Sequence, residues 1–374
     1  MSEYSQILEN YRLEGRLRAI PAEAGTDVLD LSTNDYLGLS LRHDLTEEFM
    51  SQSLRIPFTS AASRLLASRQ REYGELEDWL SAAYGKEALL FNSGYHANTG
   101  CVSALSGVKG TAIVADKLVH ASIIDGIRLG KAPFRRFLHN DVGSLRRELE
   151  KASASAEYVW VIVESVYSMD GDMAPLREIA ALKASFPKMM LYVDEAHALG
   201  VFGAKGLGVC ESLGLLPEID VLIGTFGKAC ASMGAFAAAS RELKDFLLNS
   251  ARSFIFSTAL PPVNVAFTHF MLRKIAGMEA ERKHLAEISE LFRRRLSALT
   301  GLPSVSSSQI VPLMAGGNAR ALELSESLRK HDILALPIRK PTVPAGTERI
   351  RFSLNASLQE TDIDHVINVL SDAL

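Results

Sequence analysis

The stretch that decides the fold class is Asp220-Val-Leu-Ile-Gly-Thr-Phe226, followed by Gly227-Lys228-Ala229. Its apolar residues predict a buried strand, and the small residues behind them predict a turn at the strand's end. Lys228 lies in that turn, where partial burial would make its amine a better nucleophile towards a carbonyl carbon. Most lysines after strands are simply solvated, so this stretch needs support from another part of the chain.

A second apolar run gives that support. Leu191-Tyr-Val-Asp194-Glu-Ala-His197 predicts another buried strand, which ends in an acid and an imidazole. Asp194, His197 and Lys228 would then lie at neighbouring strand ends. This set suits pyridoxal phosphate, because an aspartate can keep the pyridine nitrogen protonated while a lysine forms a Schiff base.

The composition is typical of a soluble globular protein. Of the 374 residues, 47% are hydrophobic and 22% are charged. The net charge of −4 does not indicate the excess of basic residues that is typical of nucleic-acid-binding proteins. No apolar run reaches the roughly 20 residues of a membrane span, and the N-terminus lacks a signal region. Cys101, Cys210 and Cys230 have no metal-ligand spacing. We therefore expect a cytoplasmic protein with reduced thiols, no metal, no nucleic-acid partner and no membrane contact.

The alternation of apolar and amphipathic segments predicts an α/β fold with three parts. After an N-terminal segment (residues 1–45), a large domain (46–270) has near-continuous apolar runs. Such runs predict strands buried on both faces, hence a mostly parallel central sheet flanked by helices. The runs are Ala88–Phe91, Thr111–Ala115, Tyr158–Glu164, Met190–Asp194, Val221–Thr225 and Ala235–Ala239.

The remaining residues, 271–374, predict a smaller C-terminal α/β domain. Residues 262–298 read as one long helix that leads into it. The expected strands are Val28–Leu31 near the N-terminus and Ile310–Met314, Ile333–Pro337 and Ile350–Leu354 in this domain. The expected helices are Ala319–Lys330 and Glu360–Leu374.

Polar residues follow several predicted strands of the large domain, where open α/β sheets bind their ligands. Ser93-Gly94-Tyr95 precedes a helix whose first amides could bind a phosphate, although this motif alone favours an ordinary capping serine. Thr225 could add a hydroxyl to that phosphate. His120 could stack on a pyridine ring or be a packed histidine, and Ser168 could donate to a cofactor.

Two further motifs leave alternatives. Arg349-Ile-Arg351 predicts two guanidinium groups on one strand face, which would either grip a substrate carboxylate or be surface charge. Asp194-Glu-Ala-His197 matches the box of DEAH helicases, but no Gly-x-x-x-x-Gly-Lys-Ser/Thr loop precedes it.

Taken together, the segments resemble the α-oxoamine synthases, fold-type-I transferases that use pyridoxal phosphate. The resemblance spans nearly the whole chain. It rests on Ser32–Leu39, Leu90–Asn98, His120–Gly126, Ser168–Asp172, Asp194–His197, Thr225–Lys228, Ser257–Thr258 and Arg349–Arg351. It implies a homodimer with shared active sites. Four places depart from the family pattern, namely Thr59–Arg64, Tyr73–Glu77, His96 and Leu358.

The resemblance also implies the site residues. Lys228 would bind the cofactor covalently, Asp194 would pair with the ring nitrogen, and His197 with the ring oxygen. His120 would stack on the ring and share in catalysis. The other implied contacts are Ser93, Gly94, Tyr95 and Thr225 for the phosphate, Ser168 for the ring, Thr258 of the second subunit for the phosphate, and Arg351 for the substrate carboxylate.

The implied reaction is the decarboxylative condensation of an amino acid with an acyl thioester. The pattern is most similar to members that join L-alanine to pimeloyl-CoA or a pimeloyl carrier protein, which gives 8-amino-7-oxononanoate for biotin. Members that act as 2-amino-3-ketobutyrate CoA ligase, 5-aminolevulinate synthase or serine palmitoyltransferase remain alternatives. Outside the family, the alternatives are an inactive interaction protein of this fold and a DEAH-type ATPase.

Overall fold

The structure is a computed structural model that describes every residue except 1, 21–24, 26–27, 54 and 69. The chain forms two compact units. The large unit contains Leu37–Ser168 and Met173–Arg282, and the small unit contains residues 1–36, Met169–Asp172 and Lys283–Leu374. In each unit, segments that are distant in the sequence therefore fold together.

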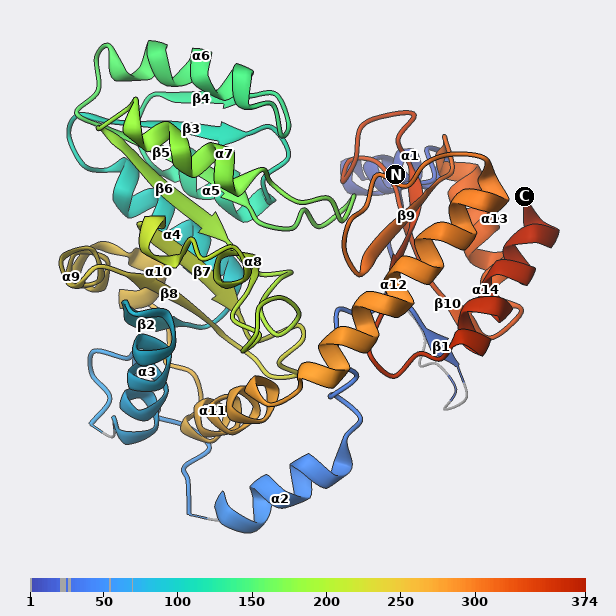
Figure 1. Ribbon diagram of the computed structural model, residues 1–374, viewed down its shortest axis with the longest axis horizontal. Coiled ribbons are helices and arrows are strands. Elements are labelled where there is room, and N and C mark those ends of the chain that lie inside the picture. Colours follow the sequence, from blue (N-terminus) through green and yellow to red (C-terminus); the bar gives the residue numbers. More distant parts are fainter. Residues whose placement is uncertain (1, 21–24, 26–27, 54, 69) are drawn as a thin grey trace. The chain divides into compact units, whose positions relative to one another are not determined.

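A seven-stranded sheet forms the centre of the large unit (Figure 1), with the order β2-β8-β7-β6-β5-β3-β4. β8 is antiparallel to β2 and β7, and the other described pairings are parallel. The predicted mostly parallel central sheet is confirmed. The strands are β2 (Glu87–Phe91), β3 (Thr111–Asp116), β4 (Phe134–Phe137), β5 (Tyr158–Glu164), β6 (Met189–Asp194), β7 (Val221–Thr225) and β8 (Ala235–Ala239).

β4 is a strand that the sequence analysis missed. Its sequence, Phe134-Arg-Arg-Phe137, has no continuous apolar run, and Arg135 and Arg136 are exposed. β4 lies at the edge of the sheet, where charged side chains are common because one side of the strand has no neighbour.

Helices complete the large unit. They are α2 (His43–Ser53), α3 (Arg71–Tyr84), α4 (Gly94–Ser106), α5 (Ala121–Leu129), α6 (Val142–Ser153), α7 (Leu176–Ala181), α8 (Val209–Ser212), α9 (Arg241–Ser250), α10 (Arg252–Ile255) and α11 (Pro262–Ala276), with short 3₁₀ turns at Leu182–Ala184 and Leu216–Glu218. α4 packs against β3, β7 and β8. α5 lies so close to α4 that a Cβ atom on Gly126 would come within 2.9 Å of Val102 Cβ. Glycine at position 126 thus lets the two helices meet next to the carbonyl of Asn98.

The single helix predicted over residues 262–298 is wrong. Two helices occupy this region, α11 and α12 (Glu279–Thr300), and Gly277 ends the first by donating its N–H to Lys274 and Ile275 carbonyls. The apolar periodicity continues across the break, but glycine has a low helix propensity and is common where helices end.

The small unit has two small sheets and the helices that cover them. β1 (Leu29–Asp30) pairs in parallel with β10 (Ile333–Leu334), while β11 (Leu336–Ile338), β12 (Arg349–Ser353) and β9 (Ile310–Met314) form an antiparallel sheet in that order. Its helices include α1 (Glu3–Leu13), α13 (Asn318–Arg329) and α14 (Glu360–Ala373). The predicted strand Ile333–Pro337 is therefore two strands in different sheets. Within the described part of the chain, no helix is both long and apolar enough to cross a membrane.

Candidate active site

Lys228 and His197 meet at the carboxyl ends of two neighbouring parallel strands. β7 ends at Thr225 and β6 at Asp194, and the following turns bring Lys228 Nζ within 2.7 Å of His197 Nε2. His197 is buried and Lys228 is half-buried. The turn after β7 is held by backbone hydrogen bonds between Phe226 and Gly234 and between Ser232 and Phe226. A nucleophilic amine and a proton acceptor are thus adjacent in a fixed turn.

Asp194 ends β6 with its carboxyl group buried, at 4% exposure. Its Oδ1 accepts a hydrogen bond from the Ala196 N–H at 2.9 Å, and its Oδ2 accepts one from Asn98 Nδ2 at 2.7 Å. Two donors therefore fix the orientation of this carboxyl group. Asn98 was not predicted as a site residue, although it lies inside the Leu90–Asn98 segment.

His120 caps the N-terminus of α5. Its Nδ1 accepts from the Ser122 N–H at 3.2 Å and lies 2.7 Å from Ser122 Oγ. Loss of solvation lowers the pKa of His120, and the nearby charge of Asp194 only partly opposes this effect. The imidazole is therefore neutral near pH 7, and its orientation is set by the start of α5.

The N-terminus of α4 lies against the end of β7. A Cβ atom on Gly94 would be 3.5 Å from Thr225 Cβ, so backbone and hydroxyl are close together. Ser93 is the N-cap of α4, and its Oγ accepts from the His96 N–H at 3.3 Å. The capping role considered from the sequence is therefore present. It leaves the first amides of the helix pointing out of its end, where an anion can bind them.

The structure also shows where Tyr95, Ser168 and Thr258 lie. The Tyr95 hydroxyl donates to Asp125 Oδ2 at 2.7 Å, so this side chain is directed towards α5. Ser168 is half-buried beyond the end of β5. Thr258 is exposed, and its carbonyl accepts from Asn92 Nδ2 at 2.7 Å.

Arg349 and Arg351 belong to β12 of the small unit. Both are only 4% exposed, so the surface-charge interpretation is wrong. Arg349 forms an ion pair with Asp170, whereas Arg351 donates to Asn34 Oδ1 at 2.9 Å and to the Tyr36 hydroxyl at 3.5 Å. Burial raises the pKa of Tyr36 to about 12 although Arg351 opposes this, so Arg351 faces a neutral hydroxyl at pH 7.

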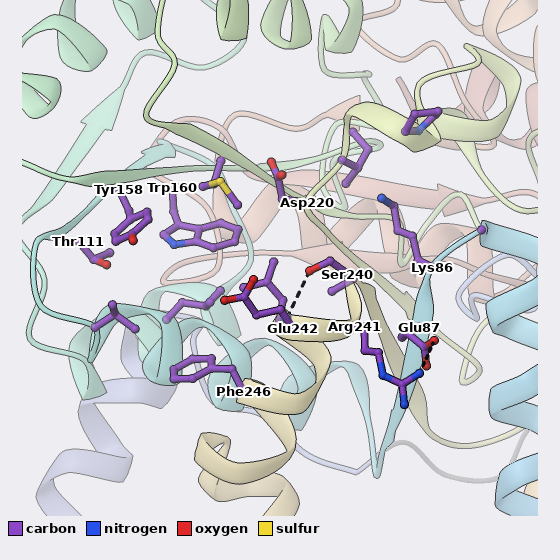
Figure 2. A pocket seen from close by; sticks show the side chains of 18 of the residues that line it. Lys86, Glu87, Thr111, Tyr158, Trp160, Asp220, Ser240, Arg241, Glu242 and Phe246 are labelled. Atoms are coloured by element: carbon purple, nitrogen blue, oxygen red, sulfur yellow. Dashed lines mark hydrogen bonds and ion pairs between the residues drawn. The ribbon is translucent and has the colours of Figure 1, made fainter.

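A cavity of about 910 Å³ lies at the amino-terminal ends of the parallel strands, on the side of the large sheet opposite to Lys228 and Asp194. Thr111 and Tyr158, which line it, are the first residues of β3 and β5. Figure 2 shows Trp160 and Phe246 on its walls together with charged groups such as Lys86. None of the candidate site residues lines this cavity, so it is separate from the carboxyl ends of the strands.

Comparison with known proteins settles the family. The model of the family described as aminotransferase class I and II matches residues 26–370. A putative 8-amino-7-oxononanoate synthase of Pasteurella multocida is 45% identical over 99% of this chain and 98% of its own length. The 8-amino-7-oxononanoate synthase of Haemophilus ducreyi is 46% identical over 92% of this chain and 91% of its own. The chain belongs to the α-oxoamine synthase family.

Solved structures of the same family agree. A serine palmitoyltransferase from Sphingomonas wittichii has a TM-score of 0.89 at 30% identity, with 99% of this chain and 96% of that chain covered. The 8-amino-7-oxononanoate synthase of Francisella tularensis has a TM-score of 0.80 at 26% identity, with 93% and 98% covered. The family membership confirms the predictions of a pyridoxal-phosphate-dependent transferase, and it excludes the DEAH-type ATPase.

Proposed function

We propose that this α-oxoamine synthase condenses L-alanine with a pimeloyl thioester, with loss of CO₂, to form 8-amino-7-oxononanoate. The observation that supports its chemistry best is the 2.7 Å contact between Lys228 Nζ and His197 Nε2. The choice of substrates is supported by the two relatives of that name from P. multocida and H. ducreyi, which are 45% and 46% identical to this chain.

The residues at the carboxyl ends of the strands fit pyridoxal phosphate. The Lys228 amine suits the aldehyde, the buried Asp194 carboxyl group suits a protonated ring nitrogen, and His197 suits the ring oxygen. The start of α4 at Ser93-Gly94-Tyr95, together with Thr225, suits the phosphate. When bound, the cofactor accepts the electron pair that is left at the amino-acid Cα after loss of a proton or of CO₂.

The side chains of this chain would divide the proton transfers between them. The Lys228 amine, in its unbound form, would take the Cα proton. His197, at hydrogen-bond distance from Nζ, holds the amine in place and limits its rotation. The Asp194 carboxyl group would help to keep the ring nitrogen protonated. Because His120 is neutral, its ring can pack on an aromatic surface without adding positive charge beside Lys228.

Arg351, rather than Arg349, would bind the alanine carboxylate. Arg349 already forms an ion pair with Asp170, which holds its guanidinium group inside the small unit. Arg351 donates hydrogen bonds to the Asn34 and Tyr36 side chains, and its guanidinium group would bind a carboxylate through charge-assisted hydrogen bonds. We further propose a homodimer in which the exposed Thr258 reaches the phosphate bound by the partner, with Ser168 beside the ring.

The test is a substrate matrix. Purified protein is assayed for CO₂ release and thiol release with alanine, glycine or serine against pimeloyl, acetyl, succinyl and palmitoyl thioesters. The proposal predicts the highest kcat/KM for alanine with pimeloyl thioester, by at least about tenfold. A preference for glycine with acetyl or succinyl thioester, or for serine with palmitoyl thioester, would assign one of the alternative activities.

A further inference from the structure

Two buried carboxyl groups end neighbouring strands of the large sheet. Glu164 is the last residue of β5 and Asp194 the last residue of β6, and their Cα atoms are partners in the parallel ladder. They are 3% and 4% exposed. Two like charges this close, away from water, strongly disfavour each other, so one negative charge for the pair is much more stable than two.

The hydrogen bonds treat the two acids differently. Asp194 accepts from Asn98 Nδ2 at 2.7 Å and from the Ala196 N–H at 2.9 Å. Glu164 receives a backbone hydrogen bond from His120, while its Oε1 is buried without any partner. Burial raises the pKa of Glu164 well above its ordinary range, and the negative charges of Asp194 and Asp116 raise it further. The positive charge of Lys228 acts in the opposite direction and lowers this pKa.

The amide of Asn98 is itself held in one orientation. Its NH₂ group donates to Asp194 Oδ2, so the amide oxygen faces away from that carboxyl group. That oxygen accepts from the Tyr192 hydroxyl at 2.7 Å, and Nδ2 also lies 3.0 Å from Ser122 Oγ. Asn98 is 2% exposed and Tyr192 is fully buried. The donor is therefore in place without any ligand.

We propose that Asn98 is a positioning residue whose amide makes Asp194, rather than Glu164, the negatively charged member of this buried pair. This choice of the charged acid is a property of the folded chain and does not depend on a bound ligand. Its consequence, a negative charge aimed at the ring nitrogen, rests on the proposed function. Removing the amide leaves both acids buried with poorer solvation of the charge on Asp194, so the proton that Glu164 holds is partly transferred to Asp194.

Isotope-edited infrared spectroscopy of the full-length protein tests the selection directly. Protein is made with ¹³C-labelled aspartate, which shifts the carbonyl band of a protonated aspartic acid but not that of a protonated glutamic acid. In the unaltered chain, the band of buried protonated acid should contain a component that is insensitive to the label and is lost in Glu164→Gln. In Asn98→Leu, a label-sensitive component should appear and should vanish when Asp194→Asn is added.

The result that overturns the proposal is an Asn98→Leu spectrum identical to that of the unaltered chain. If Asn98→Leu does not fold, Tyr192→Phe replaces it as the test variant, because it removes only the hydroxyl that orients the Asn98 amide. Its spectrum should contain a label-sensitive component, smaller than the one expected for Asn98→Leu. Tyr84→Phe is the matched control, since Tyr84 is 3% exposed and its hydroxyl donates to the Leu207 carbonyl at 2.8 Å. This variant should leave the spectrum unchanged.

A second measurement separates this inference from the proposed function. Asn98→Leu should bind pyridoxal phosphate roughly tenfold more weakly, as expected for loss of a hydrogen bond to a charged group. If the unaltered protein does not bind the cofactor but shows the expected infrared bands, the proposed function is wrong, while the proposed role of Asn98 is still supported. If it turns over alanine normally and Asn98→Leu changes neither spectrum nor affinity, the inference alone fails.

Discussion

Lys228 Nζ lies 2.7 Å from His197 Nε2, in a turn that follows the parallel strands β6 and β7. A contact of this length needs a donor on one atom and a lone pair on the other, so at most one proton can lie between the two nitrogens. The pair can therefore position an amine and share its proton. Both properties are needed in a residue that first binds a carbonyl compound and later acts as a base.

Asp194→Asn is expected to slow removal of the alanine α-proton by about a hundredfold or more while the cofactor remains bound. A neutral amide stabilises a protonated ring nitrogen less than a carboxylate does. The measurement is exchange of the α-proton with D₂O, followed by NMR without any thioester. Asp245→Asn, on the exposed face of α9, is the control and should exchange at the normal rate. Normal exchange in Asp194→Asn would remove the proposed role.

Arg351→Ala is expected to raise the KM for alanine by roughly ten- to a hundredfold, since a hydrogen bond to a charged group contributes about 1.5–3 kcal/mol. The KM for the thioester should change much less. Arg349→Ala should instead lower the stability of the protein, because it leaves the partly buried Asp170 without its ion-pair partner. Thermal unfolding measured beside the kinetics distinguishes the two. An alanine KM that responds only to Arg349→Ala would transfer the role to that residue.

Glu164→Gln should stabilise the protein more at pH 8 than at pH 5. The pKa of Glu164 is raised in the folded state above its usual value of 4.5, so above that value the folded chain binds a proton that the unfolded chain has lost. Stability then falls as the pH rises towards the folded-state pKa, and glutamine removes this dependence. Urea unfolding of cofactor-free protein at both pH values gives the difference. Glu150→Gln, exposed on α6, should show no such trend. Equal effects of Glu164→Gln at both pH values would contradict a raised pKa.

A homodimer with shared sites predicts complementation. Lys228→Ala and Thr258→Glu proteins should each be inactive, the second because its charge repels the phosphate. Mixed under conditions that exchange subunits, they should recover part of the activity, since some hybrid dimers contain one intact site. Sedimentation of the unaltered protein should show a dimer. A fully active monomer would exclude the shared site.

Much of this arrangement was predictable from the sequence because it depends on local patterns. The runs that form β5, β7 and β8 are continuous and apolar, so even their limits were predicted correctly. Lys228 could be singled out because it follows such a run in a turn of small residues. β4 was missed because an edge strand with exposed arginines lacks that pattern.

Asn98 was missed for a different reason. It lies on α4, whose residues are buried on nearly all sides, so no amphipathic pattern marks the face that carries it. Its partner Asp194 is 96 residues away in the sequence, and only the packing of α4 on the sheet brings them together. The contacts of Arg349 and Arg351 with Asp170 and Asn34 were hidden in the same way. Long-range pairs of this kind depend on the fold rather than on spacing.

The most direct test is to find where pyridoxal phosphate becomes attached. Protein incubated with the cofactor should absorb visible light, and reduction with borohydride followed by peptide mass spectrometry should locate the pyridoxyl group on Lys228. Lys228→Ala should show neither signal and should lose at least about a thousandfold in activity. Lys86→Ala, which alters a half-buried lysine at the opposite edge of the same sheet, should retain both. A pyridoxyl group on another lysine, or a colourless protein with no adduct, would contradict the assignment of Lys228 and the site built around it.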